Sequence, residues 1–137
     1  MRILIADDQE RVRFALRVLL AQQPGVQVVG EAANGEVLLA QAGAVAADLA
    51  LVDWELPRLA EAGGLPGIHR SAPALQIVVL SSRPGVRQAA LAAGGDAFVS
   101  KGEPPERLLT VIRRCGGMTE PGGSHVTPER LSVDERL

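Results

Sequence analysis

Acidic, hydroxyl and basic residues stand at the ends of four short apolar segments of the chain. They are Asp7 and Asp8 after the first segment, then Asp53, Ser81 and Lys101. Adjacent carboxylates repel each other unless a cation lies among them, and carboxylate oxygens are ligands that Mg²⁺ prefers. The three acids therefore predict a magnesium site, provided that the fold brings them together.

This set of residues is suited to phosphoryl transfer. A carboxylate beside Mg²⁺ can attack a phosphoryl group and form an aspartyl phosphate. A lysine ammonium offsets the charge on the phosphoryl oxygens in transit, and a hydroxyl can hydrogen-bond one of them afterwards. Asp53 is the predicted acceptor because it stands alone on its segment, and Asp7 and Asp8 are the predicted metal holders. Ser81 and Ser82 compete for the hydroxyl role.

Simpler interpretations of the same residues remain open. Asp7 and Asp8 also suit the cap of a following helix, because an aspartate there accepts backbone N–H bonds. Asp53 is compatible with a loop position at the end of a strand, and Lys101 with a solvated surface lysine.

The elements that must position these residues alternate along the chain. Five apolar, β-rich runs cover 2–6, 26–32, 49–52, 76–80 and 97–100, and stretches of helical spacing lie between them. Such alternation predicts a parallel sheet with helices on both faces. In such sheets ligands bind at the carboxyl ends of the strands, where the predicted site residues stand.

Helical spacing is clear at 10–22, 36–43, 86–93 and 104–115. The remaining helical segment is poorly marked, because three prolines and three glycines fall within 56–73. We expect a short or irregular helix there, since both residue types disfavour a helix interior.

Length and composition limit the classes of protein to consider. A chain of 137 residues is sufficient for one domain, and 14 basic against 16 acidic residues give no electrostatic reason to expect nucleic acid or an acidic membrane as partner. The lone Cys115 excludes an internal disulfide, and no apolar run approaches membrane-spanning length. We expect a cytoplasmic protein with one domain at 1–115. Residues 116–137, rich in Gly, Pro, Ser and charge, are predicted to be a flexible linker or tail.

Four segments resemble the receiver domain of two-component response regulators, and the resemblance extends over residues 1–115. The segments are ADDQERVR, LVDWELP, VVLSS and GDAFVSKGEPPERL. The resemblance implies an α/β, flavodoxin-like (βα)5 fold, a doubly wound parallel sheet with strand order 2-1-3-4-5. The segments RVRFALRVLL and SKGEPPERLL are most similar to receivers of the subfamily usually joined to a LuxR/NarL-type helix-turn-helix domain.

The resemblance also implies a role for each residue around the metal. Asp53 resembles the phosphoacceptor, and the resemblance implies that it is also a ligand of the Mg²⁺ cofactor. Asp8 is similar to a direct Mg²⁺ ligand, and Asp7 to a ligand that acts through water. The backbone carbonyl of Glu55 would complete the protein's share of the metal shell.

Three further residues match positions that respond to phosphorylation in this family. Lys101 is similar to the phosphoryl-binding lysine, Ser81 to the switch hydroxyl, and Phe98 to the aromatic that changes rotamer on activation. We add one hypothesis from the residues themselves. Glu55 and Arg83 flank the mouth of the site, and an ion pair between them would hinder an attacking water and prolong the phosphorylated state.

The implied function is a receiver in phosphorelay signal transduction. A sensor histidine kinase donates the phosphoryl group, and the receiver switches its partner-binding surface, with a homodimer on phosphorylation as a further expected partner. The chain is not expected to be an enzyme beyond promoting its own phosphoryl transfer and dephosphorylation. DNA is expected as a partner only if a helix-turn-helix domain is missing from this sequence, because the 22 residues after 115 are too few to form one.

Two other functions compete with this interpretation. A degenerate receiver would act as a phosphorylation-independent interaction module. Only 20 positions separate Ser81 from Lys101, which predicts a trimmed fourth helix and favours this alternative. A phosphohydrolase of the haloacid dehalogenase type also uses a nucleophilic aspartate with Mg²⁺, but that family spaces its two aspartates two positions apart, whereas Asp7 and Asp8 are adjacent.

Overall fold

The computed structural model describes residues 1–115, so the predicted linker or tail at 116–137 lies outside the described residues. Strands and helices alternate along the described chain. The strands are β1 (Arg2–Ala6), β2 (Gln27–Ala32), β3 (Leu49–Asp53), β4 (Gln76–Ser81) and β5 (Ala97–Ser100). The helices are α1 (Glu10–Ala21), α2 (Gly35–Ala44), α3 (Gly64–Ser71), α4 (Arg87–Ala92) and α5 (Pro105–Cys115), with a 3₁₀ turn η1 (Pro84–Val86) before α4.

The five strands form one parallel sheet in the order β2-β1-β3-β4-β5, which confirms the predicted flavodoxin-like topology. Strand β3 lies at the centre and each of its five residues is buried. The strand order reverses at β1, because the chain runs first to β2 on one side and then to β3 on the other. A ligand site is therefore expected at the carboxyl ends of β1 and β3.

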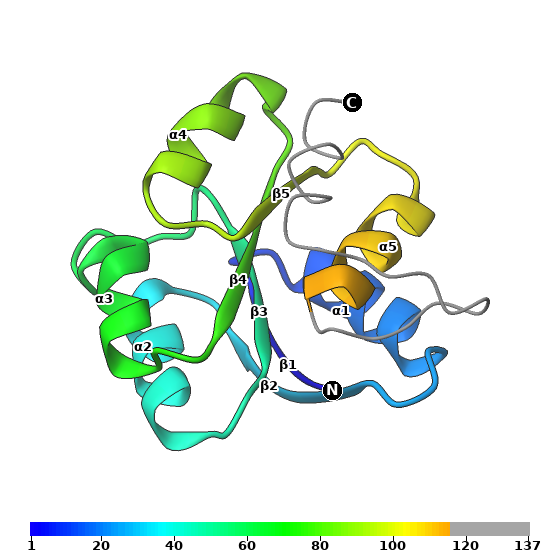
Figure 1. Ribbon diagram of the computed structural model, residues 1–137, viewed down its shortest axis with the longest axis horizontal. Coiled ribbons are helices and arrows are strands. Elements are labelled where there is room, and N and C mark those ends of the chain that lie inside the picture. Colours follow the sequence, from blue (N-terminus) through cyan, green and yellow to red (C-terminus); the bar gives the residue numbers. More distant parts are fainter. Residues whose placement is uncertain (116–137) are drawn as a thin grey trace.

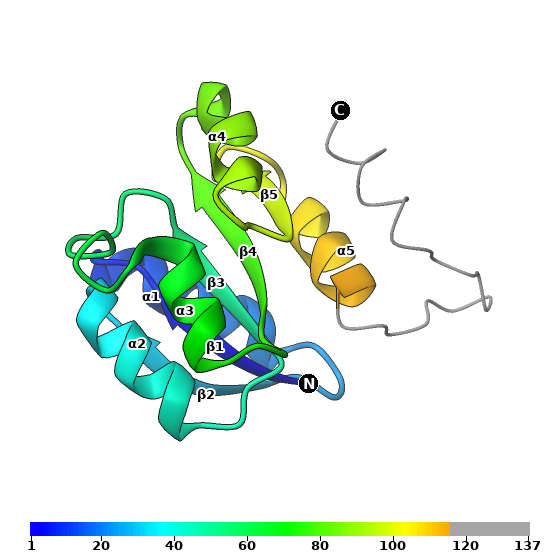
Figure 2. The same cartoon turned by 60° about the vertical axis from the view of Figure 1, so that its left-hand side comes forward.

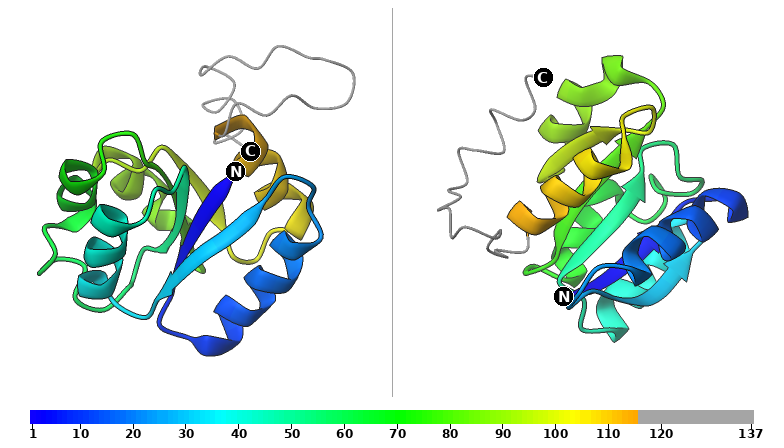
Figure 3. Two further views of the ribbon diagram at one scale, coloured as in Figure 1. Left: turned by 90° about the horizontal axis from the view of Figure 1, so that it is seen from below. Right: turned by 90° about the vertical axis from the view of Figure 1, so that its right-hand side faces the viewer.

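Alternate residues of the strands form two apolar layers, one on each face of the sheet. Leu4, Val52 and Val79 belong to the cluster on the face of α2, α3 and α4. Ile5 and Leu51 belong to the cluster on the face of α1 and α5. Figure 1 shows these two groups of helices on opposite sides of the sheet, and Figure 3 shows α1 and α5 together on one face. Helices therefore cover both faces of the sheet, and the carboxyl ends of the strands are left to present the site.

The two helices expected to be short are short. Helix α3 has 8 residues and begins only at Gly64, after a series of turns that follows β3. Gly63 has a φ of 91°, a conformation that favours glycine, so the late glycines set the start of this helix. Helix α4 has 6 residues, which confirms the prediction of a trimmed helix before Lys101. In Figure 2, α2 and α3 lie side by side while α4 stands apart from them.

The segment that follows the predicted acceptor is anchored to α2. The backbone N–H of Gly35 donates to the carbonyl of Pro57 at 2.7 Å. A Cβ at Gly35 would collide with the carbonyl of Arg58, so this close approach requires glycine. Arg58 itself has a positive φ of 62° and forms an exposed ion pair with Glu36 at 2.6 Å. The start of α2 therefore braces the β3–α3 connection.

Among residues 1–115, the helices lack the combination of length and hydrophobicity that is needed to cross a bilayer.

Candidate functional site

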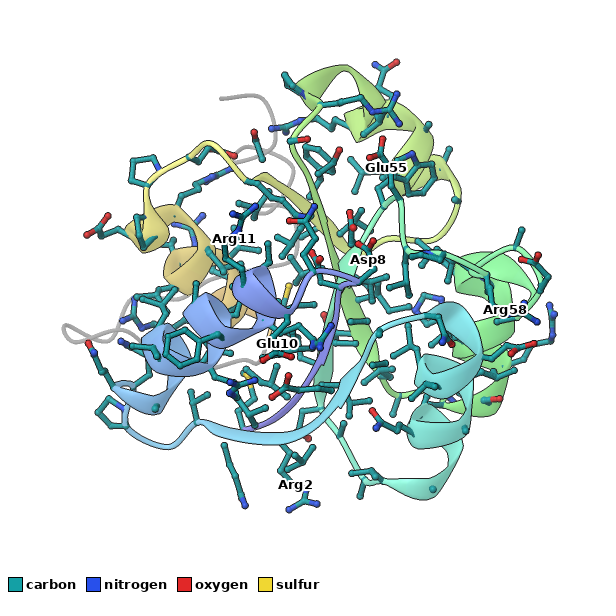
Figure 4. The ribbon with its side chains drawn as sticks, turned by 180° about the vertical axis from the view of Figure 1, so that it is seen from behind. Arg2, Asp8, Glu10, Arg11, Glu55 and Arg58 are labelled. Atoms are coloured by element: carbon teal, nitrogen blue, oxygen red, sulfur yellow. The ribbon has the colours of Figure 1, made fainter. Side chains whose placement is uncertain are left out.

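The carboxyl ends of β1 and β3 bring together the three acids singled out in the sequence. One carboxylate oxygen each from Asp7, Asp8 and Asp53 lies within 4.8 Å of the other two. Asp7 and Asp53 are buried, with 1% and 6% of their surface exposed, whereas Asp8 is exposed. In Figure 4, Asp8 lies beyond the end of β1 that is opposite to Arg2, between α1 and Glu55. Such hard oxygen ligands, partly open to solvent, fit a hydrated Mg²⁺ ion.

Lys101 reaches the same cluster from the end of β5. Its Nζ donates a hydrogen bond to Asp7 Oδ2 at 2.7 Å and lies 3.5 Å from Asp53 Oδ1. Burial lowers the pKa of Lys101, but its contacts with Asp7 and Asp53 outweigh burial, so the pKa lies above its ordinary value. The ammonium therefore stays charged between two buried carboxylates. The interpretation of Lys101 as a solvated surface lysine is wrong.

Asp53 is held at the centre of the site in an environment that disfavours its charge. Burial raises the pKa of Asp53, and the negative charges of Asp7 and Asp8 add to this effect. The backbone N–H of Glu55, 3.2 Å from Asp53 Oδ1, and the ammonium of Lys101 oppose it only in part. A cation among these acids would favour the ionised form that a nucleophile requires.

The loop that carries the acidic pair is fixed by hydrogen bonds on both sides. Asp7 Oδ1 accepts the N–H of Gln9 at 2.9 Å, but Gln9 is the residue that precedes α1, and no side chain among residues 1–115 caps the start of this helix. The interpretation of the acidic pair as a helix cap is therefore wrong, and Asp7 Oδ2 faces Lys101 instead. Arg13 Nη1 donates to the backbone carbonyl of Asp7 at 2.6 Å, and its Nε donates to Glu31 at 3.1 Å.

Sequence reasoning assigned no role to Arg13. It falls off the apolar stripe of α1, where an arginine is ordinarily solvated. Its side chain is only 14% exposed because it bridges α1, the acidic loop and Glu31 on β2. The available signal was the pair Glu10 and Arg13, which are three positions apart and form an ion pair in the structure. Glu31 also binds Arg17 at 2.6 Å, so the bridge has a second anchor.

The structure distinguishes the two candidate hydroxyls at the end of β4. Ser81 is buried and its Oγ accepts the backbone N–H of Arg83 at 3.0 Å, whereas Ser82 is exposed. The carbonyl of Ser81 also accepts the backbone N–H of Lys101 at 2.8 Å, which ties the ends of β4 and β5 together. Position therefore favours Ser81, and its role as a switch remains a prediction.

Glu55 and Arg83 form the ion pair expected across the mouth of the site. Both side chains are exposed, to 50% and 59% respectively. Figure 4 shows Glu55 on the side of the site near α4. The pair lies in water and is screened, so it contributes little to the stability of the fold. Its effect on dephosphorylation remains a prediction.

Phe98 lies away from the acids, inside the apolar layer beneath α4. It is only 1% exposed and belongs to the core cluster that includes Val79 and Ala90. The guanidinium of Arg87 on α4 covers its ring, 5.6 Å from the ring centroid. Phe98 thus occupies the position of a core aromatic, and its change of rotamer remains a prediction. The sequence did not indicate that Arg87 covers it.

Comparison with known proteins agrees with this geometry. The response regulator receiver domain family matches residues 3–113 of the chain. The response regulator UvrY of Escherichia coli K12 is 30% identical over 115 residues, which represent 82% of this chain and 53% of UvrY. The chain therefore spans about half the length of this curated relative.

Solved structures of similar proteins share the fold. The isolated REC domain of RcsB from Salmonella enterica serovar Typhimurium, in the presence of phosphomimetic BeF₃⁻, is 28% identical with a TM-score of 0.74 and covers 98% of this chain and 97% of that one. A two-component response regulator of the LuxR family from Aurantimonas sp. SI85-9A1 is 25% identical with a TM-score of 0.75, covering 98% and 96%.

Proposed function

The chain belongs to the response regulator receiver domain family, and we propose that it accepts a phosphoryl group on Asp53 from the phosphohistidine of a sensor histidine kinase. The observation that supports this proposal is the convergence of Asp7, Asp8 and Asp53 within 4.8 Å, with Lys101 between two of them. Burial of Asp7 and Asp53 costs free energy because their charges leave water, and the ammonium of Lys101 offsets that cost in part.

Asp8, Asp53 and the backbone carbonyl of Glu55 would hold Mg²⁺, and Asp7 would bind it through water. When bound, the ion supplies positive charge that favours the ionised form of Asp53 and offsets the charge of the phosphoryl oxygens. The carboxylates are close enough to share one ion, and exposed Asp8 leaves it open to water.

In the proposed transfer, an oxygen of Asp53 attacks phosphorus as the phosphorus–nitrogen bond of phosphohistidine breaks. The imidazole leaves with the bonding electron pair and takes up a proton. Lys101 turns from Asp7 to a phosphoryl oxygen, which it stabilises with its ammonium charge. Ser81 then hydrogen-bonds another phosphoryl oxygen, and Phe98 moves in response. The chain promotes only its own phosphorylation and dephosphorylation, so it is not an enzyme that turns over a separate substrate.

The signal would leave through a partner-binding surface on the α4–β5 side, and phosphorylation would favour a homodimer. The chain spans about half the length of the curated relative UvrY. DNA would be a partner only if a helix-turn-helix domain outside this sequence were joined to it. The short α4 favours a second candidate, a receiver that contacts its partner without phosphorylation. The presence of Asp7, Asp8, Asp53 and Lys101 favours the receiver that is phosphorylated.

The decisive experiment measures intact mass after incubation with Mg²⁺ and acetyl phosphate. We expect the native protein to gain the mass of one phosphoryl group, and the gain to disappear on addition of chelator. Asp53→Ala should show no gain, while Asp48→Ala, which removes an acid at the opposite end of β3, should behave as the native protein does. No gain in the native protein would leave the phosphorylation-independent module as the better function. A gain in Asp53→Ala would place the acceptor elsewhere.

A further inference from the structure

The turn that presents Lys101 is closed by a second acidic residue, Glu103, to which the sequence assigned no role. The backbone N–H of Glu103 donates to the carbonyl of Ser100 at 3.1 Å. This bond spans four residues, so Lys101 and Gly102 occupy the two central positions of a β-turn. The turn follows directly from β5 and precedes α5.

The Glu103 side chain closes the same turn from its other side. Its Oε2 accepts the backbone N–H of Ser100 at 2.7 Å. The N–H of Lys101 donates to Ser81 on β4, and N–H groups alternate along a strand, so the N–H of Ser100 points away from β4. Strand β5 is at the edge of the sheet, and Glu103 supplies an acceptor where no further strand stands.

Glu103 is itself held in place by α5. Its Oε1 forms an ion pair with Nε of Arg107, one helical turn later, at 3.3 Å. Both side chains are largely shielded, with 28% of Glu103 and 13% of Arg107 exposed. The carboxylate therefore joins three parts of the chain: the end of β5, the turn and the first turn of α5.

The turn borders an open groove, so polar contacts contribute to its conformation. Ser100, Lys101, Glu103 and Pro104 line a groove of about 530 Å³ between α1 and α5. Side chains that line an open groove are less constrained than those in a close-packed core. Besides the contacts of Lys101 with Ser81, Asp7 and Asp53, the hydrogen bonds that close its turn constrain where its backbone lies.

We infer that Glu103 is a positioning residue for Lys101: by binding Ser100 N–H and Arg107 it fixes the turn that directs the ammonium to Asp7 and Asp53. This inference rests on the proposed function, because it assumes that the ammonium of Lys101 binds the phosphoryl group. The side chain of Glu103 binds Ser100 and Arg107 rather than the acids of the site, so it would act through Lys101.

The test uses the whole chain with Mg²⁺ and beryllofluoride, and follows binding by the fluorescence of Trp54, the single tryptophan, next to the acceptor. We expect Glu103→Ala to weaken beryllofluoride binding about fivefold to tenfold, which corresponds to the usual net contribution of one intramolecular hydrogen bond. Glu103→Gln keeps an oxygen acceptor and should recover most of the binding. Mg²⁺ affinity, measured without beryllofluoride, should change less than about twofold, because the acids are untouched.

Two controls separate positioning from a general effect of charge. Glu106→Ala removes the same charge from an exposed position in the first turn of α5 and should leave beryllofluoride binding unchanged. In the Lys101→Ala background, Glu103→Ala should have no further effect, because the residue acts through Lys101. A second reading comes from Lys101 as the only lysine in the sequence. A ¹³C-lysine label therefore gives one side-chain NMR signal. Its chemical shift should move toward the value of the unfolded chain in Glu103→Ala, but not in Glu106→Ala.

The possible outcomes are distinct. Equal weakening by Glu103→Ala with and without Lys101, or an unmoved lysine signal, would overturn the inference while the proposed function stands. If Glu106→Ala weakened beryllofluoride binding as much as Glu103→Ala, Glu103 would act only through its negative charge, and the inference would also be overturned. Native protein that binds no beryllofluoride would overturn the proposed function, and the role of Glu103 in phosphoryl binding with it.

Discussion

The buried floor of the site and its exposed mouth carry charges of both signs, yet they differ in how firmly those charges are held. We define the site floor as Asp7, Asp53, Ser81 and Lys101, and the site mouth as Asp8, Glu55 and Arg83. Each floor residue is fixed by hydrogen bonds to neighbouring strands or turns. At the mouth, the ion pair of Glu55 and Arg83 stands in solvent.

This difference shows where chemistry is determined and where it is adjusted. Charges in the floor interact strongly because little water screens them, so each change there alters binding and stability together. Charges at the mouth are screened, so a change there alters metal binding or access to the site but leaves the fold intact. Substitutions in the two regions should therefore differ in size and in kind.

The largest effect is expected from Lys101→Ala in the floor. Loss of the ammonium removes the contacts of Lys101 with Asp7 and Asp53, and beryllofluoride binding should fall about 100-fold, as for loss of one electrostatic stabiliser. Titration of Trp54 fluorescence at fixed Mg²⁺ measures this. Mg²⁺ binding itself should persist, because the acids remain. A fall of less than about threefold would show that the lysine is not part of phosphoryl binding.

A smaller effect is expected from Asp53→Asn in the floor, which should stabilise the metal-free protein rather than weaken it. The pKa of Asp53 is raised in the folded chain, chiefly by burial, so folding favours its neutral form. That preference stabilises the fold at pH below the unfolded pKa, and the stabilisation is lost as the pH rises through the folded pKa. Asp53→Asn is neutral at every pH and should raise the free energy of unfolding at pH 7 by on the order of 1 kcal/mol.

Urea unfolding in chelator measures this difference, and Asp8→Asn is the matched control at the mouth. Because Asp8 is exposed, its substitution should change the free energy of unfolding by less than about 0.5 kcal/mol. The gain from Asp53→Asn should shrink as the pH is lowered toward 3. Addition of Mg²⁺ should stabilise the native protein more than Asp53→Asn, since only a metal-binding site gains by mass action. If Asp53→Asn and Asp8→Asn changed the free energy of unfolding equally in chelator, the distinction between floor and mouth would be lost.

The sequence predicted which strand ends come together in the floor. It did not predict which side chains bind each other there. Apolar runs locate strands because burial on both faces requires them, and the observed β1 and β5 have the predicted bounds, 2–6 and 97–100. Strand order places Asp7, Asp53 and Lys101 at one edge for any chain of this topology. Side-chain pairing was less accessible, because it depends on local turns.

Two contacts illustrate what the sequence did not contain in readable form. Lys101 binds Asp7 at 2.7 Å and is farther from Asp53, because the turn closed by Glu103 sets its direction. Arg13 turns inward because Glu31, far from it in sequence, lies on the adjacent strand β2. To predict either pairing, one must know which segments lie side by side. The hydrophobic periodicity of a sequence indicates helices and strands but not these side-chain partners.

The smallest effect is expected at the mouth, from Arg83→Ala. The variant breaks the ion pair with Glu55 but keeps the backbone N–H that binds Ser81. Because an exposed ion pair is worth at most about 1 kcal/mol, loss of the phosphoryl group should accelerate by no more than about fivefold, and the free energy of unfolding should change by less than about 0.5 kcal/mol. Mass spectrometry after removal of the phosphodonor gives the rate. Arg58→Ala is the matched control, because it breaks a similarly exposed pair with Glu36 on the α2 side of the sheet. An unchanged rate in Arg83→Ala, or an equal change in Arg58→Ala, would show that the mouth pair does not restrict water, and the floor alone would then set the lifetime of the phosphorylated state.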